Sequence, residues 1–154
     1  MATRAQVQSV ARSFAKTPFK DQHRLKGKRG GIDCVGLVLL TAEELGICYT
    51  DTALMRGSDY LNYNPQSVNS QVLQECTKRL VNKHVKDIRP GDIVVMRAGS
   101  SQPSHAAIIT AGPGGVLYMI HAYNGGPMEV TEHILDVKWQ RRIAGAFEYP
   151  GLED

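Results

Sequence analysis

The sequence contains little cysteine and few aromatic residues: three cysteines and 6% Phe, Trp and Tyr in 154 residues. It has no Cys-x-x-Cys pair, and its histidines lack the spacing of a zinc site, so we expect no metal centre. We also expect no disulfide framework, and therefore synthesis in a reducing compartment. The longest apolar run, residues 32–40, is interrupted by Asp33 and is shorter than the ~20 residues that a bilayer span requires.

A secretory signal is also missing, because the first residues lack an apolar stretch, so we expect synthesis in the cytoplasm without classical export. The formal charge of +3, from 18 basic and 15 acidic residues, is too small to indicate a nucleic-acid partner. Lysine and arginine are concentrated in residues 1–31, where Asp21 is the only acidic residue. Two interpretations stay open for this segment: a surface for an anionic partner, or a solvated loop.

Hydrophobic periodicity divides the chain into a helical first half and a β-rich second half. Apolar spacing predicts helices over residues 3–15, 32–46 and 67–82. Later β-type runs predict strands over 93–96, 104–110, 116–122, 128–131 and 144–149. Helices followed by an antiparallel meander indicate a single α+β domain over residues 1–154.

Cys34 differs from the other cysteines in its position, because it follows a Gly-Gly loop and opens an apolar helix. The positive end of a helix dipole favours the thiolate, which is the nucleophilic form of cysteine. The alternative is a buried, unreactive thiol. Cys48 and Cys76 lack this setting, and Cys76 lies on the apolar stripe of a predicted helix, so we interpret it as a core residue.

Two histidines flank a predicted β-hairpin. His105 begins one strand, His121 ends the next, and a Gly-Pro-Gly-Gly turn joins the two strands. The hairpin therefore brings the two imidazoles to one rim of the sheet, where His105 can face Cys34 as a base and His121 can orient it. Alternatively, the two histidines are unrelated, and one of them is a surface residue or a metal ligand.

Four segments in this order resemble the NlpC-type cell-wall cysteine peptidases. They are residues 31–38 (Gly-Ile-Asp-Cys-Val-Gly-Leu-Val), 89–94 (Arg-Pro-Gly-Asp-Ile-Val), 104–109 (Ser-His-Ala-Ala-Ile-Ile) and 119–122 (Met-Ile-His-Ala). The resemblance implies a papain-like fold, with N-terminal helices packed on a C-terminal antiparallel β-sheet. It also implies hydrolysis of peptidoglycan stem peptides without a cofactor.

Carried over residue by residue, the resemblance makes Cys34 the nucleophile, His105 the general base and His121 the orienting residue. It places Asp33 beside the amino group of the substrate. A carboxylate at this position can equally serve as the N-cap of the helix, and both roles are compatible.

Two positions depart from the family pattern. Val35 stands where the family usually has a serine that helps to hold the substrate amine. Phe19 stands where the family has a tyrosine, so the hydroxyl that would donate toward the oxyanion is absent. The backbone N–H of Cys34 remains as a donor, and Gln22 or His23 are candidates for the second one. Losing one oxyanion donor costs about 3 kcal/mol in the transition state, so the substrate and rate stay open.

Residues 17–23 (Thr-Pro-Phe-Lys-Asp-Gln-His) more narrowly resemble the phage and gene-transfer-agent tail branch of this family. This resemblance implies a virion enzyme that contacts tail-tip or hub proteins, needs no nucleic acid, and acts in the periplasm or cell wall. Two other functions stay open: a structural tail-tip plug or adaptor with weak or no activity, and an amidase on the same fold. We also consider a sugar-binding role for three tyrosines, Tyr49, Tyr60 and Tyr63, and expect Trp139 to cover the core.

Overall fold

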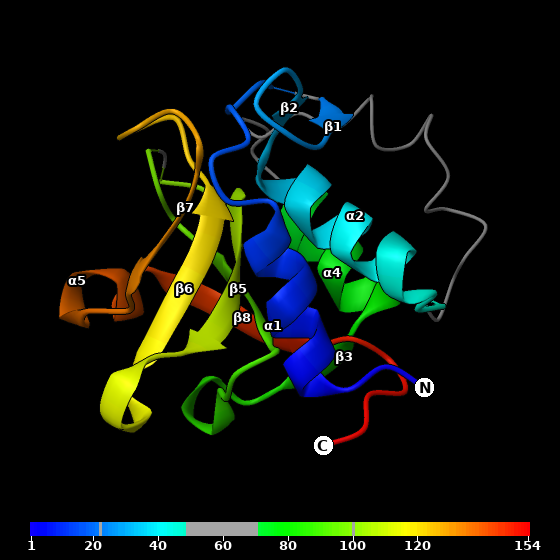
Figure 1. Ribbon diagram of the computed structural model, residues 1–154. Coiled ribbons are helices and arrows are strands. Elements are labelled where there is room, and N and C mark those ends of the chain that lie inside the picture. Colours follow the sequence, from blue (N-terminus) through cyan, green and yellow to red (C-terminus); the bar gives the residue numbers. More distant parts are fainter. Residues whose placement is uncertain (22, 49–70, 100) are drawn as a thin grey trace.

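A computed structural model describes residues 1–21, 23–48, 71–99 and 101–154 of the chain (Figure 1). Its helices are α1 (Arg4–Ser13), α2 (Cys34–Leu45), α4 (Gln71–Arg79) and the short α5 (Val137–Gln140). Its strands are β1 (Arg24–Leu25), β2 (Gly31–Ile32), β3 (Val81–Lys83), β4 (Ile93–Met96), β5 (His105–Ala111), β6 (Leu117–Ala122), β7 (Val130–Ile134) and β8 (Ile143–Glu148). Gln22 and the three tyrosines of residues 49–63 lie outside the described residues.

Local sequence signals set the ends of the first two helices. Thr3 caps α1 in a capping box with Gln6, whose side chain accepts a hydrogen bond from the Thr3 backbone. Asp33 caps α2 through the N–H of Gly36. Gly46 ends α2 with a left-handed φ of 65°, which glycine adopts at little cost. The predicted helices over 3–15 and 32–46 are therefore confirmed, with α1 and α2 slightly shorter.

The main sheet has six antiparallel strands in the order β3-β8-β4-β5-β6-β7. Strands β4 to β7 form the predicted meander, and β8 returns across the sheet to lie between β3 and β4. The small hairpin of β1 and β2 stands apart from this sheet and leads directly into α2. A Cβ atom on Gly30 would collide with the carbonyl of Leu25, so glycine permits the tight turn that precedes Cys34.

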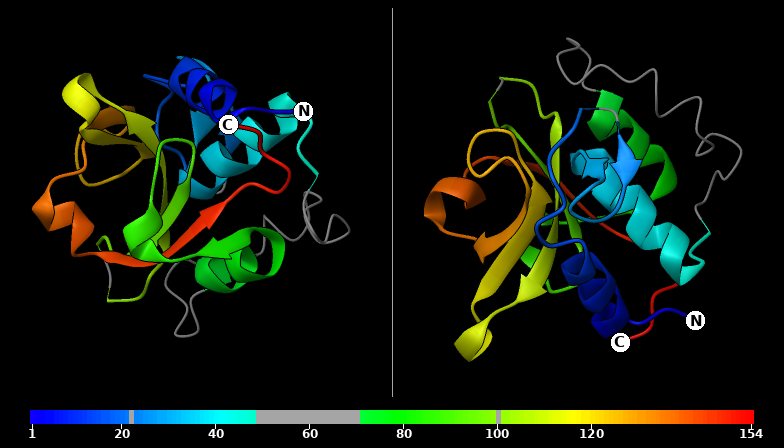
Figure 2. Two further views of the ribbon diagram at one scale, coloured as in Figure 1. Left: turned by 90° about the horizontal axis from the view of Figure 1, so that it is seen from below. Right: turned by 45° about the horizontal axis from the view of Figure 1, so that its top comes forward.

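Two hydrophobic clusters cover the two faces of the sheet. Helices α1, α2 and α4 lie on one side, and α5 lies on the other (Figures 1 and 2). Alternating strand residues such as Ala106 and Ile108 join the helices in the larger cluster. Their neighbours Ala107 and Ile109 belong to the second cluster, against which Trp139 packs. The expectation that Trp139 covers core residues is confirmed.

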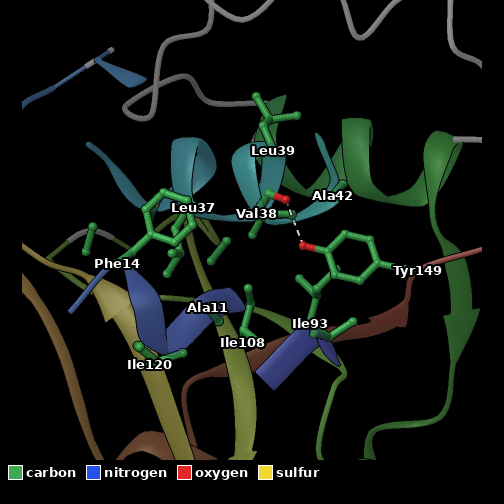
Figure 3. Close-up of a cluster of buried hydrophobic side chains, with 14 of the residues drawn as sticks. Ala11, Phe14, Leu37, Val38, Leu39, Ala42, Ile93, Ile108, Ile120 and Tyr149 are labelled. Atoms are coloured by element: carbon green, nitrogen blue, oxygen red, sulfur yellow. Dashed lines mark hydrogen bonds between the residues drawn. The ribbon is translucent and has the colours of Figure 1, made fainter. Parts of the chain in front are cut away.

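A buried tyrosine near the C-terminus links the last strand to α2. Tyr149 is 1% exposed, and its hydroxyl donates to the carbonyl oxygen of Val38 at 2.7 Å (Figure 3). A buried phenol needs such a partner, because leaving the hydroxyl unsatisfied costs about 1–3 kcal/mol. This bond fixes the end of the chain against the helix that begins at Cys34.

The Arg-Pro-Gly-Asp segment has a structural role through a buried ion-pair network. Asp92 is fully buried and accepts from Arg4 at 2.6 Å, from Lys83 at 2.7 Å and from the backbone N–H of Arg89 at 2.9 Å. Arg4 also pairs with Glu148 on β8. The network joins α1, β3, the start of β4 and β8, and so brings both ends of the chain together.

We expect Asp92→Ala to lower the free energy of unfolding by about 3–5 kcal/mol, because it leaves buried cationic partners unpaired. Urea unfolding followed by circular dichroism measures this loss. The matched control is Glu44→Ala, which removes the exposed pair with Lys26 and should cost about 0–1 kcal/mol. Equal losses in the two variants would contradict a stabilising role for the Asp92 network.

The α+β fold class is confirmed, whereas the helix predicted over residues 67–82 ends earlier than expected. In place of a helix through residue 82, α4 ends at Arg79, and Val81 begins an edge strand that pairs with β8. Apolar Leu80 and Val81 continue the helical spacing, but Val81 is exposed on this edge, so pairing with β8 overrides the local pattern. Among the described residues, none of the helices is long and apolar enough to cross a membrane.

Candidate active site

Cys34 is the first residue of α2 and lies against the beginning of β5. Its side chain is 6% exposed. The thiol donates to the carbonyl oxygen of Ser104, at an Sγ–O distance of 3.9 Å, and the sulfur accepts from the backbone N–H of Ala106. These two backbone groups flank His105 in the chain. The structure therefore brings Cys34 and the backbone of His105 together, while a direct contact between the sulfur and the imidazole stays a prediction.

The expected preference for a thiolate at Cys34 is wrong for the unliganded protein. Burial raises the pKa of the Cys34 thiol to about 12, and the nearby Asp33 carboxylate raises it further. Backbone N–H groups of Val35 and Ala106 lower the pKa, but their effect is smaller than that of burial. Helix position alone indicated the opposite sign, because it contains no information about desolvation. The Cys34 thiol is therefore neutral in the folded protein.

Asp33 is buried, with a side chain that caps α2. Its Oδ1 atom accepts from the Gly36 N–H at 2.7 Å, and its backbone N–H donates to the carbonyl of His23. The N-cap role is therefore present, and the expected contact with a substrate amine stays a prediction. This backbone bond fastens His23 to the residue that precedes Cys34.

His105 and His121 form a direct hydrogen bond, with 2.6 Å between Nε2 of His105 and Nδ1 of His121. Strands β5 and β6 are antiparallel neighbours, and His121 lies diagonally across the ladder from His105. The prediction that the hairpin brings these imidazoles together is confirmed. Both rings are buried, with His105 6% and His121 2% exposed.

A third imidazole, that of His133, extends this pair, and no local sequence pattern indicated it. Its Nε2 atom lies 2.8 Å from Nε2 of His121, and its Nδ1 lies 2.9 Å from the carbonyl oxygen of Ile134. Trp139 and Tyr123 pack against the same rings, at centroid distances of 5.1 Å and 5.4 Å from His121. The register of β6 with β7 places His133 beside His121, and this register cannot be predicted from the local sequence.

Burial keeps the imidazoles of His105 and His121 uncharged. It lowers the pKa of His105 to about 3, assisted by Arg142 and His133, and the pKa of His121 to about 2, assisted by the other two histidines. Despite the three imidazoles, no group of His, Cys, Asp and Glu within the described ranges has the arrangement to hold a metal ion. A neutral imidazole can accept a proton from a thiol, so the arrangement supports general-base chemistry.

Acid should destabilise the protein through these two rings. Because the pKa of His105 falls from 6.5 to about 3 on folding, the folded state binds fewer protons, and stability is lost as the pH falls through this range. We expect His105→Gln to flatten the decrease of Tm with acid, measured by differential scanning fluorimetry. The exposed His84 provides the control, and His84→Gln should retain the wild-type decrease.

The thiol and the imidazoles have different neighbours around the beginning of β5. Cys34 belongs to the cluster on the helical face. His105 shares its strand alternation with Ala107 and Ile109, which belong to the opposite cluster, and its ring lies 6.3 Å from that of Trp139. The backbone of Ser104 and Ala106, which contacts the Cys34 sulfur, therefore lies next to His105 and joins the two parts of the candidate site.

The remaining predicted site residues lie on the loop before α2. Phe19 is half-buried, packs against the larger core and pairs with Ile32 through its backbone. Its N–H also donates to the Met128 carbonyl at 2.7 Å. Val35 packs on the same core, and His23 is exposed, with its ring nitrogen 2.8 Å from the Asp21 carbonyl oxygen. The oxyanion roles of this loop stay predictions.

The helices packed on a six-stranded antiparallel sheet form an α+β fold of the papain-like class. The model of the NlpC/P60 family matches residues 20–148, and the chain belongs to this family. No curated protein sequence matches the chain.

Two solved structures share the fold. One is an NlpC/P60 family protein from Bacillus cereus ATCC 10987, with a TM-score of 0.57 and 18% identity, covering 96% of this chain and 40% of that one. The other is Ly7917 with the hydrolyzing product of MDP, with a TM-score of 0.59 and 14% identity, covering 97% of this chain and 64% of that one. The chain thus spans less than two thirds of either structure.

Proposed function

We propose that this protein is a cell-wall hydrolase that cleaves peptidoglycan stem peptides as a cysteine endopeptidase. The observation that carries the proposal is the buried His105–His121 pair at the beginning of β5, next to the strand backbone that contacts Cys34. Family membership supports a thiol hydrolase. The structure of Ly7917 with the hydrolyzing product of MDP supports a substrate from the cell wall.

The proposed reaction is acyl transfer through a thioester. As Sγ of Cys34 bonds to the amide carbon, its proton passes to Nδ1 of His105, because the thiol and the imidazole both start uncharged. His105 then gives this proton to the leaving amine, and the carbon–nitrogen bond breaks. Water attacks the thioester with His105 as base, and the proton returns to sulfur when the carbon–sulfur bond breaks.

We further propose that the enzyme works in the tail of a phage-like particle and contacts tail-tip or hub proteins there. Residues 17–23 support this proposal through their resemblance to the tail branch of the family. Within this segment, the backbone N–H of Phe19 donates to the Met128 carbonyl and that of Lys20 donates to the Ile32 carbonyl. On this proposal, the protein is a virion component that is made in the host cytoplasm and acts in the periplasm or cell wall.

Digestion of purified sacculi tests the proposed reaction. We expect the protein to release new amino groups, and mass spectrometry of the fragments to show peptides cut within the stem. Fragments cut between sugar and peptide would instead identify an amidase. Intact sacculi after prolonged incubation with folded protein would contradict the hydrolase function.

One observation favours a second function, a structural plug or adaptor in the same particle. The Cys34 thiol is buried with a raised pKa and donates to a backbone carbonyl, and Phe19 lacks the hydroxyl that would bind the oxyanion. An adaptor would leave sacculi intact and co-purify with tail-tip proteins. Active digestion of sacculi would exclude this function as the main one.

A further inference from the structure

Three imidazoles form one continuous hydrogen-bonded row that ends on a backbone carbonyl. His105 bonds to His121 at 2.6 Å, His121 bonds to His133 at 2.8 Å, and Nδ1 of His133 lies 2.9 Å from the oxygen of Ile134. Each strand from β5 to β7 contributes one ring. The proposed reaction uses the first two rings and leaves His133 without a role.

The carbonyl at the end of the row sets the direction of every bond in it. An amide oxygen only accepts, so Nδ1 of His133 carries the proton that it donates to Ile134. The neutral form of His133 has one N–H, and with this proton on Nδ1, its Nε2 atom accepts from Nε2–H of His121. By the same logic, Nδ1 of His121 accepts from Nε2–H of His105.

This direction leaves one defined nitrogen for proton transfer. With its proton on Nε2, His105 retains an unshared electron pair on Nδ1, which is the form that a general base requires. The opposite tautomer of His105 would place the proton on Nδ1 and disable the base. The tautomer of His105 thus depends on a carbonyl group two rings away.

We propose that His133 is a positioning residue that, anchored on the Ile134 carbonyl, fixes the tautomers of His121 and His105 for catalysis. This inference rests on the proposed function in taking His105 as the base. His133 acts through His121, which in turn holds the base.

The packing around the row keeps the rings in this order. Trp139 contacts all three imidazoles, at centroid distances of 6.3 Å from His105, 5.1 Å from His121 and 5.5 Å from His133. Tyr123 stacks on His121 with an interplanar angle of 14°. These aromatic contacts restrict ring flips, so the hydrogen-bond direction set at Ile134 is transmitted along the row.

Two substitutions distinguish the hydrogen-bond acceptor that His133 provides from the packing of its ring. In His133→Gln, the side-chain oxygen can accept from His121 at the place of Nε2. In His133→Phe, the ring remains to pack on Trp139, but no atom accepts. His84→Gln serves as the control, because His84 is exposed and caps a short turn far along the chain from the row.

The test combines ring nitrogen NMR of the substrate-free proteins with steady-state kinetics on a stem-peptide substrate. We expect wild type, His133→Gln and His84→Gln to show single Nε2–H tautomers for His105 and His121. His133→Phe should show mixed tautomers and a kcat about 10- to 100-fold lower, with KM nearly unchanged. A role in packing alone would instead lower Tm and leave the tautomers and kcat unchanged.

Wild-type tautomers in His133→Phe would overturn the inference, and so would a loss in His133→Gln equal to that in His133→Phe. The proposed function fails differently, through a wild-type protein that digests no stem peptide whatever its tautomers. The NMR readout needs no activity, so it decides the ordering role of His133 in either case.

Discussion

Cys34→Ala should abolish the release of amino groups from sacculi, with a fall in turnover on the order of 10⁴-fold or more. The methyl group of alanine cannot form the thioester, so the protein retains only its binding contribution. Folding should be affected little, because Cys34 is the first residue of α2 and Asp33 still caps that helix. The assay measures new amino groups against time, with circular dichroism confirming the fold.

The chain offers a matched control in Cys76, whose pKa burial also raises to about 12. Cys76 is half-buried and packs against the same core from α4, so Cys76→Ala removes a second core thiol that is not part of the histidine row. We expect Cys76→Ala to retain wild-type turnover. Turnover that survives in Cys34→Ala, or that is lost equally in both variants, would remove Cys34 as the nucleophile.

His121→Ala should lower kcat by about 10²- to 10⁴-fold, because His105 loses the acceptor that orients it. His121→Asn should retain part of the activity, since its side-chain oxygen can accept from Nε2–H of His105 in place of Nδ1. We expect a larger change in kcat than in KM, because the hydrogen bond positions a catalytic group and does not contact the substrate. Steady-state kinetics on a stem-peptide substrate measures both constants.

Stability measurements separate this effect from simple unfolding. His121 is buried and bonded on both sides, so we expect both variants to have a lower Tm than wild type. Kinetics are therefore measured on folded protein below the lower Tm, with His84→Asn as an exposed control. Full turnover in folded His121→Ala would contradict the orienting role and leave His121 as a packing residue.

The sequence by itself determined the helices α1 and α2, the strands β4, β5, β6 and β8, and the order of the candidate site residues. Local signals were sufficient for the Thr3 and Asp33 caps, for the Gly46 helix end, and for a hairpin that joins His105 to His121. Each of these depends on contacts within a few residues or across one tight turn. Four short segments in a fixed order were also sufficient for the family, which the match over residues 20–148 confirms.

Only the tertiary structure decided the charge state of the Cys34 thiol and the inclusion of His133 in the histidine row. The helix-start position of Cys34 indicated an acidic thiol, but burial under the sheet raises its pKa instead, and burial depends on segments far apart in the chain. His133 joins His121 through the register of β6 with β7, which no local pattern specifies. Asp92 likewise obtains its role from Arg4, 88 positions away, because a buried carboxylate is stable only where the fold supplies its cation.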